Sequence, residues 1–177
     1  MEKPNFYGSL TQCGTAHVGY SYDKGQLKDV YKPVKDLLPM VSPVDFEISG
    51  WDINGANLFD ACKRSKVLEP GLINAMKEDL EQIKPLPSVL NQEYIASNQS
   101  DRVDNVFTGT SQQCIDKVRA DIQDMKKRVD KVVVLWTANT EMYMLPVIDS
   151  MSDLKSMVDR NVSLPASVLF AMAAIEE

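Results

Sequence analysis

The stretch VVVLWTANTEM, residues 132–142, changes abruptly from a β-branched apolar run to small and polar residues. Residues 132–136 are predicted to form a buried strand, because β-branched and aromatic side chains favour strands. The residues that follow it, 137–140, are Thr, Ala, Asn and Thr. A polar segment directly after a buried strand is typical of a parallel sheet whose carboxyl end faces a ligand.

Strand and helix patterns alternate along the rest of the chain. Two further strands are predicted, at 44–51 and at 93–97, and a loop is predicted around His17. From the spacing of their apolar residues, helices are predicted at about 57–68, 72–83, 111–129 and 165–177. This order indicates an α/β fold with a mainly parallel sheet and flanking helices.

Local signals predict where the helices begin and end. Asn54 or Asn57 suits the cap of the first helix, and Thr110 or Ser111 suits the cap of the third, because these side chains accept hydrogen bonds from backbone N–H groups. Proline predicts the other boundaries, since it lacks the N–H that a helix interior needs. The signals of this kind are Glu69-Pro70-Gly71, the segment KPLPS at 84–88, and Pro165 in the first turn of the last helix.

Three predicted strands are followed by polar residues that a ligand would meet. Asp52 follows the first strand, Asn98 and Gln99 follow the second, and residues 137–140 follow the third. Since parallel strands end at the same edge of a sheet, we expect one shared ligand edge. Asp52 has two interpretations of equal weight: its carboxylate accepts the hydroxyls of a nucleotide ribose, or it caps the next helix.

Charge and cysteine content exclude several classes of protein. The net charge is −6, which argues against a general binder of nucleic-acid phosphates, and the basic cluster 126–128 is interpreted as a solvated helix end. The three cysteines lack metal or redox spacing, so a reducing, cytoplasmic location is expected. The sequence contains no apolar run of the ~20 residues that a membrane span needs, and none that is typical of a signal peptide.

No catalytic or metal-ligating residue is assigned from these patterns. The eight glycines include no glycine-rich turn of the kind that brings backbone amides close to a pyrophosphate. His17 is the only histidine and is interpreted as a surface residue, and Asp101 and Asp104 are interpreted as turn residues. The sequence therefore predicts a binding edge without visible catalytic groups.

Four segments, in their order and separation, resemble consecutive blocks of the myo-inositol-1-phosphate synthase family. They are PNFYGSLTQCGT (4–15), LLPMVSPVDFEISGWDINGANL (37–58), KPLPSVLNQEYIASNQSDRVDN (84–105) and DKVVVLWTANTEMY (130–143). The resemblance covers nearly the whole chain and weakens after Tyr143. Met142 departs from the family pattern, which has Arg after ANTE, and this loses a planar group with five hydrogen-bond donors.

The resemblance implies an isomerase of inositol and phospholipid biosynthesis that converts glucose 6-phosphate to inositol 1-phosphate, also numbered 1D-myo-inositol 3-phosphate. It implies NAD as a cofactor that is used twice, a homotetramer, and a Rossmann-type NAD-binding domain of which residues 1–177 are a part. The family's first strand and glycine loop are expected before residue 1, and its catalytic region after residue 177. The 177 residues alone are therefore expected to be inactive. They are also expected to be poorly soluble, because the apolar run 132–136 would lack a neighbouring strand.

The resemblance also implies which residues bind the cofactor. Asp52 would bind the adenosine ribose, and Ser88 and Val89 would line the adenine side. The other implied contacts are made by Gln99, Arg102, Thr137, Ala138, Asn139 and Thr140. This set coincides with the shared ligand edge that the strand pattern predicts.

Three functional interpretations remain open at this point. The chain is part of an active synthase, or it is a catalytically inactive truncated relative that acts through binding or subunit association. The third is an unrelated nucleotide-binding α/β module. Coding sequence for the glycine loop upstream and the catalytic region downstream would distinguish the first from the second.

Overall fold

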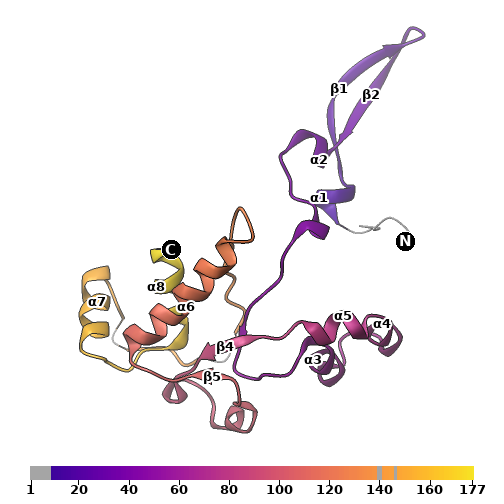
Figure 1. The fold of residues 1–177 in the computed structure, drawn as a ribbon. Coiled ribbons are helices and arrows are strands. Elements are labelled where there is room, and N and C mark those ends of the chain that lie inside the picture. Colours follow the sequence, from indigo (N-terminus) through magenta and orange to yellow (C-terminus); the bar gives the residue numbers. More distant parts are fainter. Residues whose placement is uncertain (1–8, 139–140, 146) are drawn as a thin grey trace. The chain divides into compact units, whose positions relative to one another are not determined.

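The computed structural model describes residues 9–138, 141–145 and 147–177 (Figure 1). The chain divides into two compact units, the first ending at Ile48 and the second running from Ser49 to Glu177. The elements of the first unit are α1 (Leu10–Cys13), β1 (Thr15–Asp23), β2 (Gln26–Pro33), α2 (Val34–Leu37) and a 3₁₀ turn (Pro43–Asp45). None of the helices in the described part of the chain has the length and apolar character needed to cross a bilayer.

Strands β1 and β2 form an antiparallel hairpin, so the loop predicted around His17 is wrong. The hairpin turns at Lys24 and Gly25, which both have positive φ, as the tight turns of twisted hairpins require. Across the strands, His17 Nε2 lies 3.0 Å from Asp29 Oδ1, and the His17 ring packs edge-on against Tyr20 and Tyr31. His17 therefore contributes side-chain contacts that hold the two strands of the hairpin together.

The second unit contains a parallel three-stranded sheet and the longer helices. Its strands β3 (Trp51–Asp52), β4 (Leu86–Val89) and β5 (Val106–Phe107) lie in the order β3-β4-β5. Its helices are α3 (Leu58–Ser65), α4 (Pro70–Ala75), α5 (Lys77–Gln82), α6 (Ser111–Lys126), α7 (Met151–Asp159) and α8 (Ala166–Glu176), with 3₁₀ turns at Gln92–Tyr94 and Ser97–Arg102. The α/β class and the parallel sheet agree with the sequence prediction.

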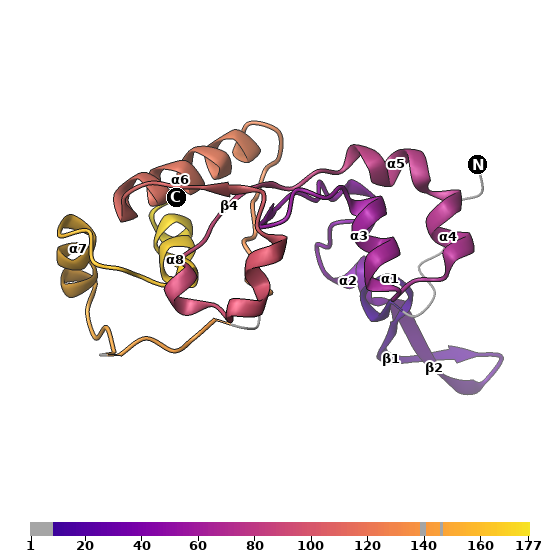
Figure 2. The ribbon, with the colours of Figure 1, turned by 90° about the horizontal axis from the view of Figure 1, so that it is seen from below.

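The core of this unit lies where α6 packs against α8, which run close together in Figure 2. From α6, Ile115 and Val118 are at most 1% exposed, and Phe170 of α8 contacts the ring of Trp51 at 5.2 Å between centroids. Cys114 lies in the same core, and burial raises the pKa of its thiol. Apolar burial of this kind is the main favourable term in folding.

Helix α6 begins with a reciprocal cap, which confirms Thr110 as the capping residue. Thr110 Oγ1 accepts a hydrogen bond from the Gln113 backbone N–H at 3.2 Å, and Gln113 Oε1 accepts one from the Thr110 N–H at 2.9 Å. Each residue thereby satisfies a donor that would otherwise lack a partner inside the helix.

The Thr110→Ala variant is expected to lower the free energy of unfolding by about 0.5–2 kcal/mol, because it removes the side-chain half of this cap. Urea unfolding followed by circular dichroism measures the change. Thr108→Ala is the matched control, since Thr108 is an exposed threonine just before the cap. Equal midpoints for the two variants would contradict the capping role.

The strand predicted at 44–51 is mostly wrong. Only Trp51 and the following Asp52 pair with another strand, and residues 43–45 form a 3₁₀ turn. Val44, Phe46 and Ile48 are each more than half exposed, so their alternation does not mark a buried face. The apolar pattern was present, but no described strand lies beside it to form a ladder.

The strand predicted at 93–97 is also wrong, and the second strand of the sheet is β4 instead. Residues 92–94 form a 3₁₀ turn that Asn91 caps, and Ile95 makes only an isolated bridge to Glu141. Pro87 fits inside β4 because the residues on either side supply the hydrogen bonds. Leu86 N–H donates to Gly50 O at 2.8 Å, and Ser88 N–H donates to Asn105 O at 3.0 Å.

Residues 132–136 form no strand with any described residue, which corrects the prediction for this segment. Val132 and Val134 pack against the core, whereas Val133 and Leu135 are 87% and 79% exposed. The alternation is that of a strand. No ladder partner lies beside it among the described residues, and one row of its apolar side chains faces solvent.

The helix predictions hold better than the strand predictions. Asn57 caps α3 by accepting from the Asp60 N–H at 2.9 Å, and α3 ends at Lys66, which has a left-handed backbone. Leu68 therefore lies beyond the helix, and Pro70 opens α4 where a break was predicted. The helix predicted at 72–83 is two helices that meet at Met76. The helices predicted at 111–129 and 165–177 are confirmed as α6 and α8, although Pro165 is the N-cap of α8 and not a residue of its first turn.

Candidate functional site

Asp52 lies exposed at the carboxyl end of β3, directly after a well-anchored residue. The Trp51 indole donates to Asp121 Oδ2 at 2.8 Å and packs on Phe170, which places the next side chain toward solvent. Asp52 Oδ1 accepts from the Asn54 N–H at 2.9 Å. Because Asn57 caps α3, the helix-cap interpretation of Asp52 is wrong, and within the described residues its Oδ2 accepts no hydrogen bond.

Ser88 and Val89 lie next to Asp52 in the sheet. Asp52 pairs with Pro87, so Ser88 and Val89 continue β4 toward the carboxyl edge, where they pair with Val106 and Phe107 of β5. Both residues are buried, at 7% and 4% exposure, and the Ser88 hydroxyl donates to Val89 O at 3.3 Å. Their side chains are therefore largely removed from solvent.

Gln99 and Arg102 belong to the 3₁₀ turn at 97–102 rather than to a strand end. The Arg102 carbonyl accepts from Asn54 Nδ2 at 3.1 Å, which ties this turn to the loop after β3. The Arg102 side chain is exposed, and the Gln99 side chain lies outside the described part of the structure. Asp52 and Arg102 are therefore brought to the same end of the sheet.

The structure shows only half of the predicted segment 137–140. Thr137 and Ala138 are exposed and lie outside regular secondary structure, while Asn139 and Thr140 are outside the described residues. Beyond them, the Met142 N–H donates to Tyr94 O at 2.6 Å, and Glu141 Oε1 accepts from the Ser167 N–H in the first turn of α8. The residues after this segment are therefore hydrogen-bonded to the turn that follows β4. Among the described hydrogen bonds, none connects them to Asp52.

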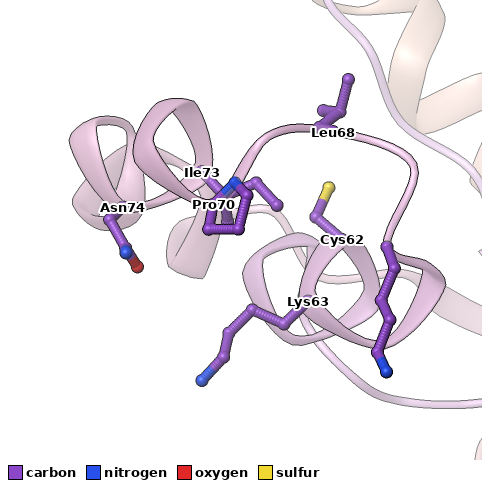
Figure 3. Close-up of a pocket in the computed structure, with 7 residues that line it drawn as sticks. Cys62, Lys63, Leu68, Pro70, Ile73 and Asn74 are labelled. Atoms are coloured by element: carbon purple, nitrogen blue, oxygen red, sulfur yellow. The ribbon is translucent and has the colours of Figure 1, made fainter.

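Two hollows lie outside the predicted edge. One of about 360 Å³ lies between α3 and α4 and is bordered by Cys62, Lys63, Pro70 and Ile73 (Figure 3). None of the predicted cofactor residues lines it. A second, of about 340 Å³, includes Glu141 and Met142 and borders the start of α8. Only the second adjoins a segment that the sequence predicts to bind cofactor.

Sequence reasoning missed the residues that hold the sheet edge together. Asn54, Asp104 and Asn105 connect the loop after β3 with the residues before β5 through side-chain hydrogen bonds. Their polar character and turn positions were visible, and Asp104 was interpreted as a turn residue. Their pairing was not visible, because it joins residues about fifty positions apart.

This arrangement has the features of a dinucleotide-binding sheet. A parallel strand ends in an exposed carboxylate, neighbouring strands end at the same edge, and helices pack beside them. A carboxylate in this place is suited to accept the hydroxyls of a ribose. Asp52 Oδ2, which accepts no hydrogen bond from a described residue, and the exposed strand end fit that group. The fold and the site therefore define a Rossmann-type, nucleotide-binding class of domain.

Comparisons with known proteins identify the family within this class. A family model of an NAD-binding domain, described as myo-inositol-1-phosphate synthase, matches residues 1–177. The chain is 42% identical to the inositol-3-phosphate synthase of Drosophila melanogaster and 41% identical to that of Saccharomyces cerevisiae, with all of this chain covered in both comparisons. The chain belongs to the myo-inositol-1-phosphate synthase family.

A solved structure supports the same relationship. The crystal structure of inositol-3-phosphate synthase from Caenorhabditis elegans matches 98% of this chain with a TM-score of 0.86 and 38% sequence identity. The chain covers only 32% of the Drosophila relative, 36% of the yeast relative and 35% of the Caenorhabditis chain, about a third of each. Because the matching family model is an NAD-binding domain, NAD is the cofactor of this family.

Proposed function

We propose that residues 1–177 contribute the adenosine side of the NAD site of an inositol-3-phosphate synthase. The whole enzyme would convert glucose 6-phosphate to 1D-myo-inositol 3-phosphate, in the cytoplasm and as a homotetramer. The observation that carries the proposal is the Asp52 carboxylate. It is exposed at the end of β3, it does not cap α3, and it adjoins Ser88 and Val89.

Each part of the edge has a separate task in this proposal. Asp52 would accept hydrogen bonds from the ribose, and the β4 backbone at Ser88 and Val89 would face the adenine. Gln99 and Arg102 would approach from the turn after β4, and residues 137–140 would continue along the cofactor. Bound NAD supplies hydride acceptance and return, whereas the residues of this chain bind and orient its adenosine half.

The proposal is tested by activity at two chain lengths. The whole gene product that carries these residues is expected to convert glucose 6-phosphate only when NAD is present. The 177-residue polypeptide alone is expected to show no conversion, because it has no glycine-rich pyrophosphate turn and spans only about a third of the length of its relatives. Inositol phosphate release, measured by chromatography, reports both results.

Two outcomes would contradict this proposal. Conversion by the 177 residues alone would show that the catalytic groups lie within them. A whole gene product that binds NAD but forms no inositol phosphate would favour the inactive relative that acts through binding or subunit association.

A further inference from the structure

The loop after β3 is held at several points by two residues that precede β5. The backbone N–H groups of Asp104 and Asn105 both donate to Ile53 O, at 3.1 and 3.0 Å. Asp104 Oδ1 accepts from the Gly55 N–H at 2.7 Å and from Asn54 Nδ2 at 3.4 Å. These bonds cross from one strand end to another and fix the backbone on the carboxyl side of Asp52.

Asn105 holds the backbone of Asp52 itself. Its side-chain amide lies 3.0 Å from Asp52 O and 3.1 Å from Leu86 O, so one group bridges the carboxyl end of β3 and the first residue of β4. Asn105 is half-buried, which limits competition from water for these bonds. A carbonyl held in this way leaves the Asp52 backbone little freedom to turn.

Asn54 connects this arrangement to the Asp52 carboxylate and to the Arg102 turn. Its N–H donates to Asp52 Oδ1, and its side-chain amide donates to Arg102 O. Both terminal nitrogens of Arg64 donate to Asn54 Oδ1 at 3.1 Å, and this contact orients the amide so that its NH₂ group faces Arg102. The two segments proposed to contact adenosine thus share one set of hydrogen bonds.

We propose that Asn54, Asp104 and Asn105 form a positioning network that sets the direction of the Asp52 carboxylate and couples it to the Arg102 turn. The inference rests on the proposed NAD site. The network makes no contact with the reacting atoms and acts through Asp52. An edge that is oriented before binding loses less conformational freedom when the ligand binds.

The test is a double-mutant cycle in the whole gene product, with NAD dissociation constants measured by ligand-observed NMR, which reaches the millimolar range. Asp104→Ala is expected to weaken NAD binding by about 3- to 10-fold when Asp52 is present. In the Asp52→Ala background the same change is expected to weaken binding less than about 2-fold, because residues that act through one another are not additive. Thermal melting of each variant controls for folding.

Two controls separate positioning from general damage. Asp104→Asn keeps an Oδ1 acceptor for Gly55 and is expected to restore most of the affinity. Asp159→Ala removes an exposed carboxylate at the end of α7, away from the sheet edge, and is expected to leave the affinity unchanged. If Asp104→Ala melts early, Asn54→Ala tests the same coupling, since it removes the amide that links Asp104 and Arg102.

The outcomes distinguish this inference from the proposed function. If Asp52→Ala leaves NAD affinity unchanged, the proposed site fails and the inference with it. If Asp52→Ala weakens binding but Asp104→Ala weakens it equally in both backgrounds, the site stands and the positioning network is overturned. An Asp104→Ala protein with unchanged affinity beside Asp52 would also overturn it.

Discussion

Ile115→Ala is expected to lower the free energy of unfolding of the 177-residue chain by about 2–5 kcal/mol. Ile115 is 0% exposed in α6, at the centre of the packing against α8. The shorter side chain loses transfer free energy and leaves a cavity that rigid neighbours fill only in part. Against a total stability of about 5–15 kcal/mol for an ordinary domain, this is a large fraction.

Urea unfolding followed by tryptophan fluorescence measures this effect, since the rings of Trp51 and Trp136 both lie against that of Phe170, a buried core residue. Ile175→Ala is the matched control, because Ile175 lies on α8 but is 72% exposed. Its effect is expected to stay within about 0.5 kcal/mol. If the two isoleucine variants unfold at the same urea concentration, the core assigned to α6 and α8 is wrong.

Helices were predictable from the sequence because their signals are local. In α6, apolar residues at spacings of three and four and the Thr110 cap specify the element within one segment. Asn57 of α3 works in the same way. Helix α7 was missed although it carries the same local signals, since Ser150 caps it and its buried residues Leu154 and Val158 lie four positions apart.

Strands were harder to predict because a strand exists only beside another strand. Residues 132–136 have the composition and the alternating burial of a strand, yet they form no ladder with a described residue. β4 was missed because the prolines of segment 84–88 were interpreted only as the end of a helix, whereas the N–H groups on either side of Pro87 supply the sheet bonds. The hairpin of β1 and β2 was missed because its aromatic and charged residues face solvent and give no buried pattern.

The position of Asp52 at a strand end was predictable, whereas the hydrogen bonds that hold the neighbouring loop were not. A carboxylate directly after a strand is a local feature, and family resemblance added Ser88 and Val89, which the sheet register places beside it. The bonds from Asn105 to Asp52 and Leu86 join distant parts of the chain. Pairings of this kind emerge only when the strands are aligned in space.

Asp52→Ala in the whole gene product is expected to weaken NAD binding by about 10- to 100-fold. Hydrogen bonds to a charged group contribute about 1.5–3 kcal/mol, and each 1.4 kcal/mol corresponds to a factor of ten in affinity. The loss of Asp52 removes a carboxylate that stands exposed at the strand end and makes one described hydrogen bond, to the Asn54 N–H. Fold stability is expected to change little, because Asp52 caps no helix.

Isothermal titration of NAD into the wild-type protein, Asp52→Ala and Asp159→Asn tests the central claim most directly. Asp159 is an exposed aspartate at the end of α7, so Asp159→Asn makes the same change in net charge away from the sheet edge. We expect NAD binding by the wild-type protein, unchanged affinity for Asp159→Asn and a loss of at least tenfold for Asp52→Ala. Equal affinities for all three proteins, or no NAD binding by the wild-type protein, would contradict the assignment of this edge as the adenosine side of an NAD site.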